Sequence, residues 1–395
     1  MLSERQPLIT LRGRFNRIRL YAGMVLGLLF IVVPASVGLA KAGATKRSLA
    51  ARHSQYLCTA EGLLLFKISG RGILDFIPVT FADNLPLPQT DYINEMLPDP
   101  HSHSLYVSWI MTYNQGSAIV SEIDRMLVSR QSKLFSVFHQ AFSPDRAGNT
   151  LRSVALGRRG RLLLVVFNSG LGSKTLLRVY RIQPHSPLRP VSKTLMLHSN
   201  FQSITTDPAG CFVYVTYTHD SHIYQYSVAP NAVLSPLAVP SIHTAGQPTA
   251  ITFLSSGHFA YVANQGGSVT LYRVGHSGQL GSSANYSLGR NKATPNLAVT
   301  PNGRFLYICL PRGNTFQYRV LANGTLQPLT PKAIRFGGYK MIVDLTGRYA
   351  YSLSNTNGSN VIYQYRIQSD GTLLPLVPRF VSKIGTPRSM AIVQN

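Results

Sequence analysis

Residues that could carry acid–base chemistry are scarce in this chain. Its 395 residues include 14 Asp and Glu against 38 Lys and Arg, and nothing in their spacing resembles a paired acid–base arrangement. Asp207, Asp344 and Asp370 fall in or beside glycine-containing turns. Short carboxylates in such places accept hydrogen bonds from nearby backbone N–H groups. We therefore expect turn or capping roles for these three residues.

The histidines form two close pairs, His101 with His103 and His219 with His222. The second pair flanks Asp220, so the three side chains could hold a metal ion. Their place in a connection between strands instead favours a solvent-facing polar cluster. The sequence contains no Gly-x-Ser-x-Gly elbow, phosphate loop or zincin helix. No metal and no cofactor are predicted.

The secondary-structure elements that must position any site are indicated by a repeated sequence motif, glycine-x-aromatic-x-tyrosine. Its glycines are spaced by 47, 46 and 44 residues, and the phrases begin at Gly210, Gly257, Gly303 and Gly347. A fixed period in this range indicates a repeat architecture built from one supersecondary unit. A β-sandwich, the alternative all-β fold, imposes no such period.

One repeat, residues 297–329, predicts four antiparallel strands. An apolar run, 297–299, is followed by a Thr-Pro-Asn-Gly turn. Phe305 and Tyr307 then share one face of a second strand, and Phe316 and Tyr318 share one face of a third. A hairpin signal at 323–324 leads to a short outer strand at 326–329. Four-stranded units repeated around an axis are the blades of a β-propeller.

Seven positions fit the tyrosine slot of this repeat: Tyr56, Tyr106, Leu164, Tyr214, Tyr261, Tyr307 and Tyr351. The folded region begins near Arg52 with a second-strand phrase, whereas residues 388–393 resemble an inner strand with nothing after it. We predict an all-β, seven-bladed β-propeller over residues 52–395, whose C-terminal strand closes the first blade. A hydrophobic N-terminal helix is expected to precede it.

Aligning the repeats places one residue per blade at the mouth of the central channel, where inner strands begin. Going round the ring, these residues are Arg388, Glu95, Ser153, Ser203, Thr249, Asn296 and Lys340. The alignment leaves this register open by one residue, most of all for Glu95. We predict a small polar pocket in which Lys340 and Arg388 hold an anionic ligand or sugar acid. The alternative is that these side chains only solvate the channel and pair with each other.

The N-terminal segment differs in composition from the rest. Residues 1–19 contain five arginines, and residues 20–40 form an uncharged run long enough to span a bilayer. The Ala-Lys-Ala sequence at 40–42 also suits cleavage of a signal peptide. Residues 20–42 are therefore predicted to be either a signal peptide or a transmembrane anchor, followed by a linker at 43–51. Both alternatives export the propeller to a periplasmic or extracellular location.

Residues 51–395 hold 30 Lys and Arg against 13 Asp and Glu. Such an excess attracts anionic surfaces, glycans or phosphates. The basic residues are scattered and no nucleic-acid motif accompanies them, so nucleic-acid binding is not expected. The run Arg158-Arg159-Gly160-Arg161 is interpreted as a solvated turn. The three cysteines, Cys58, Cys211 and Cys309, fall in separate blades, which disfavours disulfides and suggests buried apolar roles.

The phrases 207–216 and 300–308 resemble those of the seven-bladed lactonase family. That family includes propeller-type 6-phosphogluconolactonases and is close to surface proteins with Tyr-Val-Thr-Asn repeats. The resemblance implies an Arg-His pair before one inner strand and an Asn-Glu pair after the next strand. At the best-matching segment this chain has Thr249-Ala250 and Asn264-Gln265. Because glutamine cannot act as a general base, the family's acid–base residues are missing if this alignment holds.

Three functions remain open. The first is an exported, non-catalytic module that binds a small ligand or a protein. The second is a lactone hydrolase similar to 6-phosphogluconolactonase, which the fold supports only by analogy. The third is a structural surface protein that adheres to anionic cell-wall polymers. The missing carboxylates favour the first, with the membrane as a further partner if the N-terminal segment is retained.

Overall fold

A computed structural model gives the fold of residues 54–395, with gaps. It describes residues 54–59, 64–77, 92–99, 103–113, 118–129, 134–141, 150–169, 174–183, 186–198, 201–217, 219, 221–289, 294–311, 313–335, 338–356, 359–382, 384–385, 387 and 389–395. The chain divides into two compact units, residues 1–50 and 51–395, and all described residues belong to the second. The expected basic segment, hydrophobic helix and linker lie outside the described residues.

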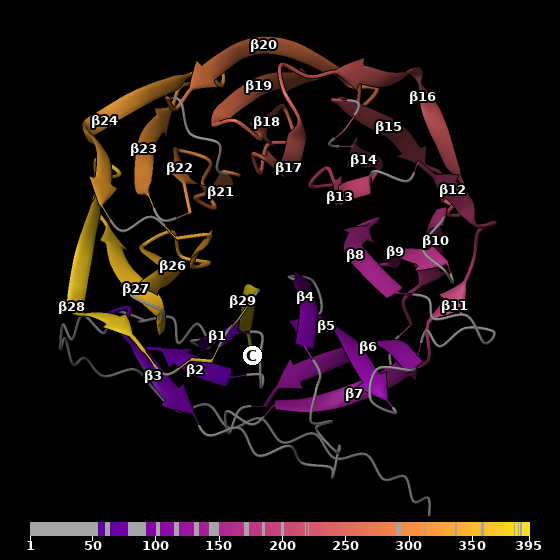
Figure 1. The fold of residues 1–395 in the computed structure, drawn as a ribbon, viewed down its shortest axis with the longest axis horizontal. Helices are drawn as coiled ribbons and strands as arrows, with labels where there is room; N and C mark the ends of the chain where they lie inside the picture. The colour runs from indigo at the N-terminus through magenta and orange to yellow at the C-terminus, as the bar shows by residue number, and fades with distance from the viewer. Residues whose placement is uncertain are drawn as a thin grey trace, which may run out of the picture. The chain divides into compact units, whose positions relative to one another are not determined.

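The described residues form seven antiparallel sheets and no helix (Figure 1). Blade 1 joins β29 (Met390–Gln394), β1 (Gln55–Thr59), β2 (Leu64–Ile68) and β3 (Leu74–Ile77). Blade 2 joins β4 (Tyr92–Asp99), β5 (Ser104–Tyr113), β6 (Ala118–Val128) and β7 (Leu134–Ala141). Blade 3 joins β8 (Thr150–Gly157), β9 (Leu162–Ser169) and β10 (Lys174–Arg181), with β11 (Arg189–Pro190) and β12 (Leu195–Leu197) sharing its outer edge.

The remaining blades follow the four-stranded pattern that the repeat predicts. Blade 4 comprises β13 (Phe201–Thr206), β14 (Phe212–Tyr217), β15 (His222–Val228) and β16 (Leu234–His243). Blade 5 comprises β17 (Pro248–Phe253), β18 (Phe259–Asn264), β19 (Ser268–Val274) and β20 (Leu280–Ser287). Blade 6 comprises β21 (Asn296–Val299), β22 (Phe305–Cys309), β23 (Asn314–Val320) and β24 (Leu326–Arg335). Blade 7 comprises β25 (Lys340–Val343), β26 (Tyr349–Thr356), β27 (Ser359–Ile367) and β28 (Leu373–Val381).

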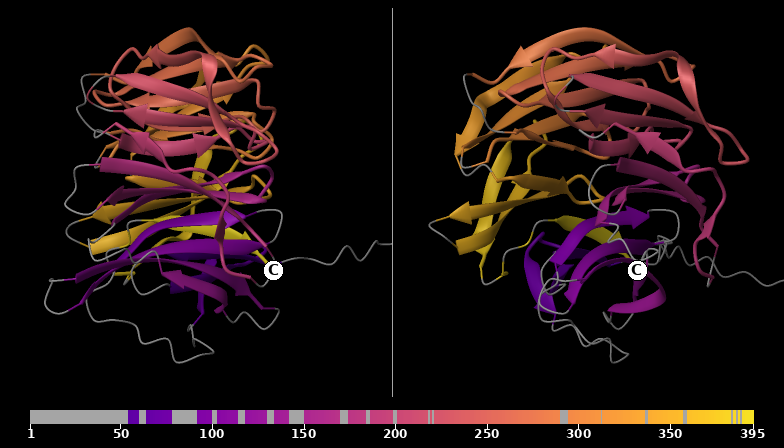
Figure 2. Two further views of the ribbon diagram at one scale, coloured as in Figure 1. Left: turned by 90° about the vertical axis from the view of Figure 1, so that its right-hand side faces the viewer. Right: turned by 45° about the vertical axis from the view of Figure 1, so that its right-hand side comes forward.

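The inner strands close into a ring. Each inner strand contacts the next in the cyclic order β29, β4, β8, β13, β17, β21, β25 and back to β29. In blade 1 the last strand of the chain pairs with the first described one, with Tyr56 opposite Val393 and Cys58 opposite Ala391. The strands run between the two faces of the ring, as the side views of Figure 2 show. We call the face where inner strands begin the mouth, and the face carrying the turns between inner and second strands the turn face.

Every predicted tyrosine slot lies in the second strand of a different blade, which confirms the repeat count. These side chains are fully buried and belong to the clusters that fill the space between neighbouring blades. The aspartates of the turns also act as expected. Asp207 accepts hydrogen bonds from the N–H groups of Cys211 and Phe212 at 2.7 Å each, and Asp344 accepts from Arg348 and Tyr349 at 2.8 Å each.

Buried glutamines in three third strands join each blade to the next. The side chain of Gln364 accepts a hydrogen bond from Leu74 N–H at 2.8 Å and donates one to Pro378 C=O at 3.0 Å. Likewise, the side chain of Gln317 accepts a hydrogen bond from Leu373 N–H at 2.7 Å and donates one to Pro331 C=O at 2.9 Å. Because buried backbone groups need partners, each glutamine stabilises two outer strands at once. Gln225 repeats the arrangement in blade 4.

Candidate functional site

Most of the predicted mouth residues share one position in their blades. Each lies opposite the residue that is two beyond the tyrosine slot, in the pairs Glu95–Ser108, Ser153–Val166, Ser203–Thr216, Asn296–Cys309 and Lys340–Leu353. In blade 5 that position is held by Ala250, which lies opposite Ala263. Thr249 is the unpaired residue of the bulge before it, a bulge that also precedes Glu95, Ser153 and Ser203 in their strands. In blade 1 the equivalent position is Ala391. Arg388 lies outside the described residues.

The carboxylate of Glu95 reaches from blade 2 to the inner strand of blade 3. Its Oε2 accepts a hydrogen bond from Ser153 Oγ at 3.0 Å and another from Val154 N–H at 2.9 Å. The backbone N–H of Glu95 is held in turn by Ser108 Oγ at 3.0 Å. Among the described residues, no hydrogen bond reaches the other carboxylate oxygen, Oε1. Glu95 is therefore fixed in direction and retains free acceptor capacity.

Lys340 enters the channel from blade 7. Its Nζ donates a hydrogen bond to Oγ of Ser389, a buried residue next to β29, at 2.9 Å. The strand that carries Lys340, β25, is positioned by Asn296 of blade 6, whose Oδ1 accepts a hydrogen bond from Met341 N–H at 2.8 Å. Since blade 1 separates blades 7 and 2, Lys340 and Glu95 approach the channel from two different directions.

Glu95 and Lys340 influence each other electrostatically. Burial raises the pKa of Glu95 above its usual 4.5, against the opposing effects of its hydrogen bonds and of the Lys340 charge. Burial likewise lowers the pKa of Lys340 below 10.5, and the Glu95 charge opposes this shift. Both groups thus have reduced preference for their charged forms, which is a common property of functional sites.

The other predicted mouth residues form bonds within their own blades. Ser203 Oγ lies 2.8 Å from Thr216 Oγ1, and Thr249 Oγ1 donates to Ala263 C=O at 3.0 Å. The structure therefore brings together Glu95 with Ser153, and Lys340 with Ser389. It leaves Ser203 and Thr249 outside these two contacts.

A cavity of about 350 Å³ extends from Glu95 toward the turn face. Its walls come from three neighbouring inner strands and their turns: Glu95, Leu97, Pro98, Val154, Ala155, Leu156, Arg159, Gly160, Ile204, Thr205, Thr206, Asp207, Pro208 and Gly210. Sequence alignment of the mouth could not find this cavity, because its walls lie further along the strands than the mouth positions. Ser389 was missed for another reason: it falls within the predicted inner strand 388–393, but its neighbour Arg388 was taken as the mouth residue of that blade.

Gln265, the residue at the acid position implied by the resemblance, lies in the exposed turn between β18 and β19. Its backbone N–H donates to Gln247 C=O at 2.7 Å.

Among the described residues, no group of three or more His, Cys, Asp or Glu is close enough to hold a metal ion. His222 packs edge-on against His243, with ring centroids 5.2 Å apart, and Asp220 lies outside the described residues.

The three cysteines are free thiols, but their burial differs from the expectation in one case. Cys58 and Cys309 are fully buried between strands. Cys211 is only partly buried, because it stands at the end of the blade 4 turn rather than within a strand.

The described part of the chain has no helix of the length and apolarity that crossing a membrane requires. The segment 20–40 lies outside it.

No protein-family model matches this sequence, and no curated protein matches it. Solved structures do match the fold. The periplasmic gluconolactonase of Pseudomonas aeruginosa superposes with a TM-score of 0.68 at 16% identity, over 86% of this chain and 99% of its own. A structure described as a 6-phosphogluconolactonase candidate from Bacteroides fragilis superposes with a TM-score of 0.64 at 17% identity, over 88% of this chain and 99% of its own. Chaetomium thermophilum Sqt1, solved with the N-terminus of ribosomal protein L10, superposes with a TM-score of 0.51 at 12% identity, over 82% of this chain and 86% of its own.

At these sequence identities the matches establish the fold but not the activity, because one fold can carry many functions. The sheet order, the closed ring of inner strands and the superpositions agree with one another. This chain has the fold of a lactonase-type seven-bladed β-propeller.

Proposed function

We propose that this chain is an exported binding protein that takes a small hydroxylated anion, such as a sugar acid, in its central channel. The observation that carries the proposal is the placement of Glu95 and Lys340, which approach the channel from different blades and influence each other's charge. Lys340 would bind the anionic group of the ligand, and the open acceptor capacity of Glu95 would bind a hydroxyl.

The cavity beside Glu95 supports a ligand of this size. Small-molecule sites are concave and combine apolar walls with a few placed polar groups. Here Leu97, Val154 and Ile204 supply apolar wall, while Thr205 and Thr206 add polar groups. A polyhydroxylated acid suits such a mixture, because it offers both a charge and several hydroxyls.

Export is part of the proposal and is supported by two observations. The basic residues before the uncharged run at 20–40 fit a signal peptide or anchor. The matching fold of a periplasmic gluconolactonase is consistent with the same compartment. A role in adhesion to anionic wall polymers would rest on the net positive charge alone.

A lactone hydrolase is the second candidate, because one observation favours it. Glu95 has a raised pKa and lies beside a cavity, so it could accept a proton from an attacking water. The proposed absence of catalysis rests on Gln265, which stands where the resemblance implies a carboxylate. Glu95 would then be a base on a different blade.

Calorimetric titration of the full-length protein with gluconate and glucuronate tests the binding proposal. We expect binding that weakens about tenfold or more in Lys340→Met, as expected for losing a charge-assisted hydrogen bond. Lys332→Met is the matched control, because Lys332 is exposed on the outer strand β24. No binding to the wild type, or equal affinity in both variants, contradicts the proposal.

A panel of sugar lactones separates binding from catalysis. Turnover by the wild type that disappears in Glu95→Gln and persists in Lys332→Met would establish the hydrolase. Binding of the acids without turnover of any lactone would establish the binding protein.

A further inference from the structure

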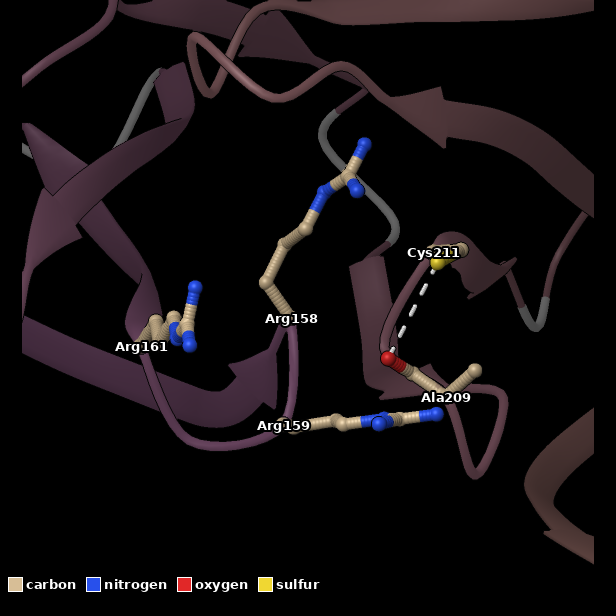
Figure 3. Close-up of a pocket in the computed structure, with 5 residues that line it drawn as sticks. All are labelled: Arg158, Arg159, Arg161, Ala209 and Cys211. Carbon is tan, nitrogen blue, oxygen red and sulfur yellow. Dashed lines mark hydrogen bonds between the residues drawn. The ribbon is translucent and has the colours of Figure 1, made fainter.

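Three arginines line a second cavity at the turn face, which shares Arg159 with the cavity beside Glu95. The turn between β8 and β9 carries Arg158, Arg159 and Arg161, and together with Ala209 and Cys211 of the next blade they enclose about 600 Å³ (Figure 3). Arg158 and Arg161 extend to the same side of the turn, whereas Arg159 extends toward Ala209. The cavity thus lies between the turns of blades 3 and 4.

The backbone of this turn differs from that of the later repeats. In blades 4 to 7 the equivalent turns place only glycine in the left-handed region, at Gly210, Gly257, Gly303 and Gly347. Here two arginines precede the glycine in that region, with φ of 50° at Arg158, 54° at Arg159 and 76° at Gly160. Left-handed backbone is sterically costly for residues with a Cβ and is often retained at functional sites. The turn is therefore poorly explained by stability alone.

Arg158 is anchored so that it holds the cavity wall in place. Its N–H donates to Gly210 C=O at 2.8 Å, and its guanidinium donates to Val228 C=O, both in blade 4. Its Nε is buried and has no hydrogen-bond partner among the described residues. Arg159 and Arg161 are exposed, and within the described part of the chain no hydrogen bond engages either guanidinium.

Among the residues that the structure describes, no carboxylate lines this cavity to balance the three charges. The nearby carboxylate of Asp207 is occupied by the N–H groups of Ala209, Cys211 and Phe212. Asp99 packs against Gly160 on another side of the turn, where a Cβ added to Gly160 would lie 2.8 Å from Asp99 Oδ1. Three guanidinium groups around one cavity therefore favour an anion with more than one negative charge.

We propose that this cavity binds the phosphomonoester group of a small organic ligand, at a site that includes neither Glu95 nor Lys340. Guanidinium forks match the tetrahedral oxygens of phosphate and can bind them in pairs. The cavity is much larger than a phosphate ion, so it has room for an organic body against Ala209 and Cys211. The phosphomonoester could belong to a free metabolite or to a lipid headgroup.

Cys211 gives a direct readout of occupancy, because it lines the cavity while Cys58 and Cys309 are fully buried. Alkylation of Cys211 by neutral iodoacetamide in the full-length protein, followed by mass spectrometry, should slow when the site is filled. Pyrophosphate is the free-anion probe. Phosphatidylcholine vesicles with and without phosphatidic acid are the lipid probe.

We expect one of these two probes to slow alkylation of Cys211 in the wild type. In Arg159→Gln/Arg161→Gln the dissociation constant of that probe should rise about tenfold or more. Arg189→Gln/Arg273→Gln is the control, because it removes the same charge from two exposed residues elsewhere in the ring. Protection by pyrophosphate assigns a free phosphate ligand, and protection only by phosphatidic acid assigns a lipid.

The inference is overturned if neither probe protects Cys211, or if the double variant and its control are protected equally. Its failure is distinguishable from that of the channel proposal. Lys340→Met should leave the protection of Cys211 unchanged, since Lys340 does not line this cavity.

Discussion

The hydroxyl of Tyr351 donates a hydrogen bond to the carbonyl oxygen of Gly72 at 2.8 Å, across 279 residues of sequence. The bond joins the second strand of blade 7 to the hairpin of blade 1. Three other repeats contain the same bond at 2.6–2.7 Å, in the pairs Tyr214–Gly278, Tyr261–Gly324 and Tyr307–Gly371. The tyrosine of the repeated phrase therefore fixes each blade to the next one.

Replacing Tyr351 with phenylalanine should lower the free energy of unfolding by about 1–3 kcal/mol, because it leaves the buried Gly72 carbonyl without a partner. Tyr349→Phe is the matched control in the same strand. Its hydroxyl bonds Gly70 C=O at 3.1 Å in an exposed position, where water can replace it. Urea unfolding followed by fluorescence measures both. An equal loss in the two variants would mean that the bond across blades 7 and 1 has no special role.

The sequence predicted the blades well because their determinants are local and periodic. The four strands expected from residues 297–329 correspond to β21 to β24, although β24 continues to Arg335, beyond the expected end at residue 329. The role of Gln317 could have been suspected from the phrases Tyr-Gln-Tyr and Phe-Gln-Tyr, which place a polar residue between two aromatics. Alternation suggests a solvent-facing glutamine there, but both faces of a blade are covered by neighbours.

The sites were harder to predict because they are formed by residues from different blades. Predicting the contact of Glu95 with Ser153 would require knowing how the inner strands of blades 2 and 3 are shifted relative to each other along the channel. The sequence of a single repeat does not specify this shift. In blade 5 the predicted mouth residue is wrong by one position. Ala250 lies seven residues before Gly257, as Ser203 does before Gly210, and the structure pairs Ala250, not Thr249, with Ala263. Arg158 and Arg159 were interpreted as a solvated turn, since the cavity they line exists only where the turns of blades 3 and 4 meet.

Glu95 should make stability depend on pH in a defined direction. Its pKa in the folded protein is raised above 4.5, so the unfolded chain loses its proton first as the pH rises. The folded protein then binds more protons, and its stability falls between 4.5 and the raised value. Glu95→Gln should remove this fall in urea unfolding measured from pH 4 to 8. Asp75→Asn, at an exposed position on β3, should follow the wild type. A wild-type curve that matches Glu95→Gln at every pH would contradict the prediction.

Gly160 is expected to be intolerant of any side chain. Its φ is 76°, and a Cβ there would lie 2.8 Å from Asp99 Oδ1. Gly160→Ala should therefore destabilise the protein by about 1–2 kcal/mol or more, from left-handed strain and the forced movement of Asp99. Gly281→Ala is the control, since a Cβ at Gly281 meets nothing within 4 Å. Thermal unfolding compares the two, and equal melting temperatures would show that the turn adapts at no cost.

The three thiols should react in two classes, and the difference follows from their positions. Burial raises the pKa of Cys58 to about 12 and that of Cys309 to about 11, so neither forms a thiolate readily in the folded state. Cys211 is partly exposed beside the arginine cavity. Titration with an aromatic disulfide reagent should therefore detect Cys211 alone in the native protein and all three thiols in denaturant. In Cys211→Ser the native signal should disappear. A residual signal from Cys58 would require blade 1 to open without global unfolding, because that residue is enclosed by the pairing of β1 with both β2 and β29.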